Sequence, residues 1–301
     1  MNLSRVIRIS RPRFWIYELW PYMIGILAAS LWIQQFGLQE TWLQNDVMQI
    51  LHAHWHILVI FALYFLVPAN IWIYGINDIY DYETDKLNPK KLEWYEALVT
   101  PDEQKKLWQR IVWTTIPFMW ILWVYAENPL SIFAFFWFLF FSWQYSAYPI
   151  RAKAKPIIDM IFSAGHYVMT AVFAWILIAP ITEINRRYVV AGMCWCMAMH
   201  LYSAIPDIQA DSEAWLSTTA MLTWERGGLI LCIVLYALAA VLSFSWIGII
   251  SLILWAVYLI MMIRTWVRLR DISQIYRYFP WVNMISGMCI FLVLLYRLIY
   301  G

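Results

Sequence analysis

The feature that most constrains the fold is a series of apolar runs, each about 20 residues long, the length that crosses the hydrocarbon core of a bilayer as an α-helix. Nine such runs follow one another: residues 14–36, 56–76, 108–126, 129–148, 157–179, 188–206, 228–244, 246–263 and 279–300. Lipid cannot satisfy an open backbone, so each run is expected to be a helix, and the uninterrupted apolar stretches argue against an alternating membrane β-barrel.

Composition supports the same class, because 63% of the 301 residues are hydrophobic and only 13% are charged. Such a chain exceeds what a water-soluble surface tolerates. We therefore expect an all-α polytopic membrane protein in which residues 1–301 form a single transmembrane domain of nine helices.

Basic residues in the connections indicate the orientation, because short cytoplasmic loops collect Lys and Arg. With the N-terminus inside, all of the 21 basic residues except Arg186, Arg187 and Arg297 fall on the cytoplasmic side. We expect a plasma (inner) membrane protein with its N-terminus in the cytoplasm and its C-terminus outside. The net charge of +2 is too small to indicate a nucleic-acid partner.

Two clusters of acidic residues follow helix ends on this same side. Residues 77–85 read "NDIYDYETD", and a helix that advances about 100° per residue brings Asp78, Asp81 and Asp85 within about 60° of one another. The second cluster, "DIQAD", carries Asp207 and Asp211 four residues apart, again on one face. Each cluster begins one of the two long connections, residues 77–107 and 207–227.

Like charges on one helix face repel unless a cation lies between them. An acidic run after a membrane helix is often only a solvated cap, but two such clusters on one side favour a bound cation. Carboxylate oxygens without paired His or Cys suit Mg²⁺, which typically takes one or two carboxylates together with water and a substrate phosphate. The clusters therefore predict Mg²⁺ and a phosphorylated ligand.

Three alternating basic residues, Arg151, Lys153 and Lys155, lie between the acidic clusters in "YSAYPIRAKAKPIID". The orientation rule alone accounts for some positive charge at this position. Three cations on the side of both acidic clusters would also bind a diphosphate that Mg²⁺ neutralises only in part. We favour the second interpretation.

Other ionisable residues within the predicted spans have simpler explanations. His166 and His200 are expected to be buried, hydrogen-bonded histidines. Asp159, just inside the fifth run, is expected to be a structural partner for a nearby cation. The "HAHWH" stretch at residues 52–56 lies on the side opposite the acidic clusters, so we do not expect a metal site there.

These motifs resemble those of the UbiA superfamily of intramembrane prenyltransferases. "NDIYDYETDKLNP" is similar to the first aspartate-rich motif of that superfamily and "DIQAD" to the second, and the resemblance covers nearly the whole chain. Within the superfamily, "SRPRFWIYELWPYMIG", "NDIYDYETDKLNPKK", "YSAYPIRAKAKPIID" and "YSAIPDIQADSEAWLSTTA" resemble, in order, the lycopene elongase branch, which makes C45 and C50 carotenoids. The "RPL"-like segment that often follows the first motif elsewhere in the family is absent after "NPKK".

The resemblance implies a UbiA-type helical bundle with a cytoplasmic-side cap and a site for an allylic substrate such as dimethylallyl diphosphate. Asp78, Asp81, Asp85, Asp207 and Asp211 would hold Mg²⁺, and Asn77, Arg151, Lys153 and Lys155 would bind the diphosphate. Catalysis would fall to Asp78, Asp81 and Asp207, with Tyr145 and Tyr202 the first candidates among many aromatic rings to stabilise an allylic cation.

Three functions stay open at this stage. The first is prenyl transfer to lycopene or a related carotenoid taken from the surrounding membrane lipid, with release of pyrophosphate. The second keeps the enzyme class and changes the acceptor to a quinone precursor or another aromatic molecule. The third is a transporter, which should carry its ionisable residues near the bilayer midplane, whereas the clusters above lie at one helix-end level. Donor length, one or two additions, hydroxylation of the product and oligomeric state are undecided.

Overall fold

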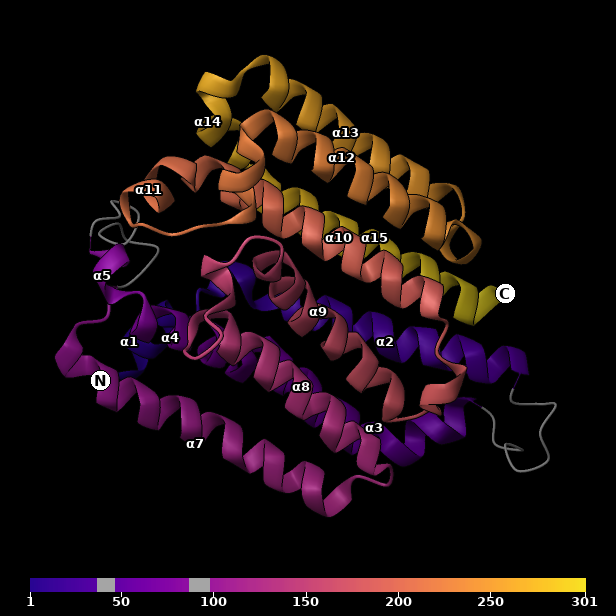
Figure 1. The fold of residues 1–301 in the computed structure, drawn as a ribbon. Coiled ribbons are helices and arrows are strands. Elements are labelled where there is room, and N and C mark those ends of the chain that lie inside the picture. The colour runs from indigo at the N-terminus through magenta and orange to yellow at the C-terminus, as the bar shows by residue number, and fades with distance from the viewer. Residues whose placement is uncertain (37–46, 87–97) are drawn as a thin grey trace.

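The computed structural model describes residues 1–36, 47–86 and 98–301, and within these residues the protein is all-helical (Figure 1). The long helices are α2 (Trp15–Phe36), α3 (Val47–Leu66), α4 (Pro68–Tyr80), α7 (Pro101–Tyr125), α8 (Pro129–Ser146), α9 (Ile158–Ile176), α10 (Arg186–Ala204), α12 (Thr219–Ile247), α13 (Ile249–Val267) and α15 (Phe279–Tyr300). Short helices complete the described chain: α1 (Leu3–Ile9), η1 (Pro12–Phe14), α5 (Tyr82–Asp85), η3 (Ala152–Ala154), η4 (Ile181–Glu183), η5 (Ile205–Asp207), α11 (Ile208–Glu213), η6 (Leu269–Asp271) and α14 (Ile272–Tyr276).

Every predicted apolar run is largely helical, and six membrane spans are supported by length and composition. In the described part of the chain, six helical stretches are long and apolar enough to cross a membrane: Pro12–Phe36, Val47–Tyr80, Arg186–Glu213, Thr219–Ile247, Ile249–Val267 and Phe279–Tyr300. Helices α7, α8 and α9 are not among the six. Nine spans therefore stay a prediction.

Local chemistry explains where several helices begin. The Thr100 hydroxyl and the Glu103 carboxylate form a capping box at the start of α7. The side chain of Asn185 accepts a hydrogen bond from the Arg187 amide at the start of α10, at 3.0 Å. The predicted run 56–76 is two helices, because Val67 leaves helical geometry and Pro68 has no N–H with which to continue α3.

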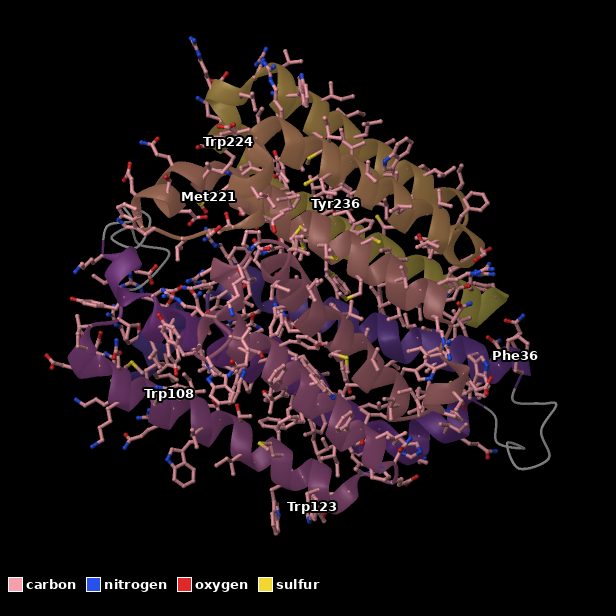
Figure 2. All side chains as sticks on the ribbon, viewed as in Figure 1. Phe36, Trp108, Trp123, Met221, Trp224 and Tyr236 are labelled. Atoms are coloured by element: carbon pink, nitrogen blue, oxygen red, sulfur yellow. The ribbon has the colours of Figure 1, made fainter. Side chains whose placement is uncertain are left out.

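The buried side chains form two large clusters, one in each half of the bundle. The first joins α2, α3, α8 and α9 through aromatic rings such as Tyr22, Phe61 and Phe135. The second joins α10, α12, α13 and α15 through Tyr202, Tyr236 and other side chains. In contrast, Trp123 projects outward from α7 and is 70% exposed, as expected of a lipid-facing side chain (Figure 2).

The long helices run side by side, and most of the short helices gather at one end of the bundle (Figure 1). The N-terminus, α1, α5 and α11 lie at that end, and the C-terminus lies at the other. Both acidic motifs are thus at the same end, as the sequence predicted. The cytoplasmic assignment of that end, and the cap, stay predictions.

Candidate active site

The first acidic motif occupies the end of α4 and the short helix α5. Asp78 lies in the last turn of α4, Asp81 is its C-cap, and Asp85 ends α5. The backbone amide of Asp85 donates to the Asp81 carbonyl, so the chain keeps a helical path across the junction. All three aspartates are buried, with 1%, 7% and 8% of their surface exposed, respectively. Three buried carboxylates in one short segment need positive charge nearby.

The protein itself supplies two of these positive charges. The Arg11 Nη2 atom donates to Asp78 Oδ1 at 2.9 Å, and the guanidinium lies 4.6 Å from the centre of the Tyr74 ring. Lys153, which is also buried, forms an ion pair with Asp81. The Asn77 amide donates to Asp81 Oδ2 at 2.7 Å and to the Ser146 hydroxyl at 3.1 Å. These contacts join α4 to the N-terminal segment, to η3 and to α8.

The second acidic motif lies where η5 passes into α11. Asp207 ends η5 and Asp211 lies in α11, and both are half-buried. Burial lowers the pKa of Lys153 to about 7, while the carboxylates of Asp211 and Asp78 act to raise it. Lys153 therefore pairs with the first acidic motif and is within electrostatic reach of Asp211 in the second.

The other two predicted basic ligands are placed differently from Lys153. Arg151 is half-buried, and its Nη1 atom donates to the Tyr148 hydroxyl at 2.8 Å. Lys155 is exposed. Of the alternating basic residues, the structure brings only Lys153 into direct contact with a motif carboxylate in the described residues.

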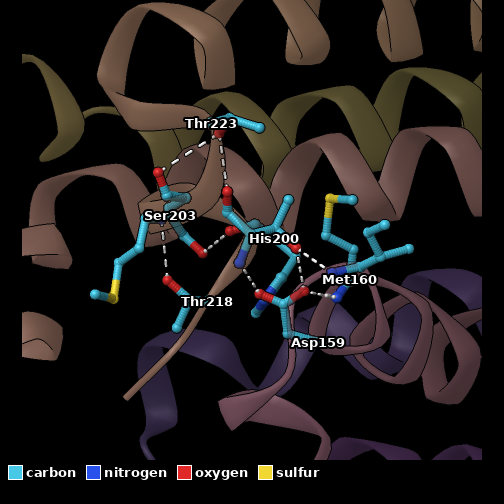
Figure 3. Close-up of polar contacts among 10 residues, drawn as sticks. Asp159, Met160, His200, Ser203, Thr218 and Thr223 are labelled. Atoms are coloured by element: carbon cyan, nitrogen blue, oxygen red, sulfur yellow. Dashed lines mark hydrogen bonds and ion pairs between the residues drawn. The ribbon is translucent and has the colours of Figure 1, made fainter. Parts of the chain in front are cut away.

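Asp159 lies at the start of α9, with Thr219 and His200 as its neighbours (Figure 3). Its carboxylate accepts hydrogen bonds from the backbone amide and the hydroxyl of Thr219, and it lies 3.8 Å from His200 Nε2. This contact fastens the start of α9 to the start of α12 and to α10. The Tyr145 ring stands edge-on to the His200 ring, with 5.7 Å between their centres.

The two aromatic residues singled out from the sequence lie in different surroundings. Tyr145 is within electrostatic reach of Asp207 and Asp211, at the carboxylate end of the bundle. Tyr202 is fully buried in the second core cluster, where its hydroxyl lies 2.8 Å from the Thr265 hydroxyl. The structure brings Tyr145 to the acidic motifs and engages Tyr202 in helix packing.

An apolar cavity of about 220 Å³ lies between the two halves of the bundle. It is bounded by α2, α9, α10, α12 and α15, and its lining includes Tyr17, Tyr167, Trp195 and Met199. Met199 directly precedes His200, so the cavity extends toward the carboxylate end. At the other end it shares Ala28, Trp175 and Tyr188 with a second, more polar pocket that opens beside Arg297.

Two residues of this region were not predicted from the sequence. Arg11 stood among the N-terminal basic residues, and only tertiary contact singles it out as the partner of Asp78. Glu18 is 1% exposed within α2 and contacts His166. The available signal for Glu18 was its charge inside an apolar run, which marks a candidate functional residue.

The fold and the site define a helical membrane protein with buried carboxylates and cations at one end of an apolar cavity. Residues 19–295 match the sequence profile of the UbiA prenyltransferase family. The chain is also 32% identical over 97% of its length to a lycopene elongase/hydratase of Haloferax volcanii, covering 89% of that protein. It is 31% identical over 80% of its length to a lycopene elongase/hydratase of Corynebacterium glutamicum, covering 77% of that protein.

The fold agrees with that family. A UbiA homologue of Aeropyrum pernix superposes with a TM-score of 0.65 at 14% identity, covering 98% of both chains. A UbiA homologue of Archaeoglobus fulgidus bound to DMAPP and Mg²⁺ superposes with a TM-score of 0.63 at 20% identity, covering 96% of this chain and 99% of that one. This chain belongs to the UbiA prenyltransferase family, and it is a prenyl-transferring enzyme.

Proposed function

We propose that the protein transfers a dimethylallyl group from its diphosphate to lycopene or a related linear carotenoid, with Mg²⁺ as cofactor and pyrophosphate as leaving group. The observation that carries the proposal is the position of Lys153. This residue pairs with Asp81 and is within electrostatic reach of Asp78 and Asp211, at the end toward which the apolar cavity extends. A charged diphosphate would thus bind near Lys153, and an apolar chain would lie in the cavity next to it.

The residues of the two motifs fit Mg²⁺ in their donor type. Asp78, Asp81, Asp85, Asp207 and Asp211 offer only carboxylate oxygens, the ligands that Mg²⁺ prefers. As the side chains stand, no three His, Cys, Asp or Glu in the described residues are grouped closely enough to hold a metal ion. When bound by these aspartates, Mg²⁺ would neutralise charge on the departing pyrophosphate.

The side chains of this protein have three tasks in the proposed reaction. Lys153 and Arg11 place positive charge beside the diphosphate, which favours its departure as pyrophosphate. Asn77 holds Asp81 in position from α4. Tyr145, beside the acidic motifs, presents an aromatic ring that would stabilise the allylic cation left behind.

The lining and the length of the cavity indicate the kind of acceptor. Its apolar lining keeps water from an allylic cation until an electron-rich double bond attacks. The cavity and the second pocket together follow α2 from Tyr17 to Phe36, a length of about 28 Å at the helical rise of 1.5 Å per residue. Such a path suits a long, linear acceptor, and two relatives that cover most of the chain are named lycopene elongase/hydratase.

Expression in a lycopene-accumulating host tests the acceptor. We expect the wild-type protein to convert lycopene into carotenoids larger by one or two C5 units, and Asp81→Ala, expressed to the same level, to leave lycopene unchanged. If wild-type protein with confirmed expression and donor supply leaves the pigments unchanged, the carotenoid acceptor is wrong. Prenylation of a quinone precursor by the same preparation would then assign the enzyme to aromatic acceptors.

A further inference from the structure

A buried Glu–His pair beside the cavity has no part in the scheme above. Glu18 in α2 and His166 in α9 are 1% and 6% exposed, and Glu18 Oε1 lies 2.7 Å from His166 Nδ1. The Thr170 hydroxyl donates to the other carboxylate oxygen at 3.0 Å. Both oxygens of Glu18 therefore have partners, one on the histidine ring and one on the threonine.

This arrangement favours one tautomer of the neutral histidine ring. A carboxylate only accepts hydrogen bonds, so Nδ1 carries the proton that points at Glu18. In the neutral ring, Nε2 then holds a lone pair able to accept a proton. No hydrogen bond to Nε2 is found within the described residues, and the His166 side chain keeps 8% of its surface exposed.

The pair lies between the diphosphate end and the apolar cavity. Tyr17, which precedes Glu18, and Tyr167, which follows His166, both line the cavity, and the His166 and Tyr167 rings are 4.1 Å apart. Glu18 is also within electrostatic reach of Tyr74. The Tyr74 ring contacts the Arg11 guanidinium, which pairs with Asp78. Glu18 and His166 are not themselves among the residues that line the cavity, but the pair lies directly behind Tyr17 and Tyr167, on the side of Tyr74 and Arg11.

Prenyl transfer to an alkene requires a proton acceptor. When the acceptor double bond attacks the allylic cation, a C–C bond forms and one positive charge moves to a tertiary carbon of the acceptor. The charge is removed in one of two ways. A neighbouring C–H bond gives its electron pair to a new C=C bond and releases a proton, or water forms a C–O bond and releases a proton.

We propose that His166 Nε2 accepts this proton, and that Glu18 holds the ring in the required tautomer and stabilises the imidazolium that forms. This inference rests on the proposed function, because it needs an alkene acceptor. Base strength at His166 would then decide how fast the reaction ends, and access of water to the same place would decide between alkene and alcohol. His166 would be catalytic and Glu18 a positioning residue.

Helix packing alone does not require this pair. A buried ion pair is often no more stabilising than apolar side chains of similar size, because two charges must be desolvated. Helices α2 and α9 already pack closely at Gly25 and Ala171, a few residues along each helix. A purely structural pair would, in addition, have no effect on which product forms.

The test uses purified full-length protein with Mg²⁺, dimethylallyl diphosphate and lycopene. His166→Asn keeps a donor toward Glu18 but has no basic nitrogen, and Glu18→Gln keeps the size of the carboxylate. Tyr22→Phe is the matched control, since Tyr22 is buried on the same helix and its hydroxyl donates to Leu58 on α3 at 2.8 Å. The Tyr22 ring packs against Phe65 and Phe173 in the first core cluster.

We expect His166→Asn to bind the donor as the wild type does and to lose product formation by about 10²–10⁴-fold, the usual contribution of a general base. Glu18→Gln should show a smaller loss and a changed ratio of alkene to alcohol, and imidazole should restore part of the activity of His166→Gly. Tyr22→Phe should keep the wild-type product ratio.

Two results would overturn the inference while leaving the proposed function intact. One is a wild-type enzyme that extends lycopene together with a His166→Asn variant of unchanged rate and product ratio. The other is loss of folding in both His166→Asn and Glu18→Gln, which would assign the pair to helix packing. A wild-type enzyme that extends no carotenoid would instead remove the proposed function itself.

Discussion

Lys153 of η3 and Asp81 of α4 form a buried ion pair that joins two segments more than 70 residues apart in the chain. Removing one member of a buried pair leaves the other charge uncompensated, at a cost of about 3–5 kcal/mol, whereas replacing both is often neutral. We expect Lys153→Met and Asp81→Asn each to lower thermal stability and to abolish prenyl transfer. The double variant should regain stability and stay inactive.

Thermal unfolding in detergent and pyrophosphate release measure these two effects separately. The lipid and detergent conditions must be the same for all four proteins. A single variant with wild-type turnover would show that the pair serves packing alone.

Arg11 is expected to bind the donor diphosphate. Arg11→Lys keeps the charge but loses the planar fork and the stacking on Tyr74. Since hydrogen bonds to charged groups contribute about 1.5–3 kcal/mol, the KM for donor should rise by about 10–150-fold. Arg13→Lys is the comparison, because the Arg13 guanidinium lies on the Phe14 ring instead. Equal KM changes in both variants would contradict a specific role for Arg11.

Gly25 allows α2 to approach the backbone of α9. A Cβ at this position would collide with the Ala171 carbonyl oxygen. Alanine normally favours a helix over glycine by about 1 kcal/mol, but we expect Gly25→Ala to destabilise the protein by about 1–3 kcal/mol through this clash. Gly192→Ala is the control, because its nearest neighbour would be the Val168 side chain at 3.4 Å. The measurement is the thermal midpoint, and an unchanged midpoint for Gly25→Ala would rule out the clash.

The Arg5–Glu103 pair predicts a loss of stability in acid. Arg5 donates to Glu103 at 2.8 Å, and this hydrogen bond holds the pKa of the Glu103 carboxyl below its ordinary value of 4.5. A lowered folded-state pKa contributes stability that is present above pH 4.5 and is lost as the pH falls through the folded-state value. The pair is partly exposed, so the contribution is expected to be about 0.2–1 kcal/mol.

Thermal midpoints measured from pH 7 downward check this prediction. The wild type should lose its advantage over Glu103→Gln at acidic pH. An advantage of constant size across the range would mean that the carboxylate charge does not matter.

Removal of Mg²⁺ should stop prenyl transfer without unfolding the protein. The aspartates are partly balanced by Arg11 and Lys153 in the protein itself, so the helices do not need the ion to stay packed. We expect a chelator to abolish pyrophosphate release, added Mg²⁺ to restore it, and the circular dichroism spectrum to stay the same. Full activity in the chelator would exclude a metal-dependent reaction.

Much of the fold followed from the sequence because lipid permits few alternatives. An apolar run in a bilayer must satisfy its backbone internally, so the helices were predictable from hydrophobicity alone. Their junctions were less so: the run at residues 56–76 divides at Pro68, and α12 extends well beyond its predicted range. Six of the predicted spans are supported by length and composition, whereas those at α7, α8 and α9 are not among them.

For the candidate site, too, the sequence predicted one part and not the other. Asp78, Asp81 and Asp85 were predictable as a group because helical spacing is local. Their partners were not, because Arg11 and Lys153 meet them only through the packing of separate segments. The sequence by itself determined the helices, the acidic motifs and their common end. Only the tertiary structure decided which cation pairs with each carboxylate, that Lys155 stays exposed and that Glu18 meets His166, because such contacts depend on distances between helices rather than on spacing along them.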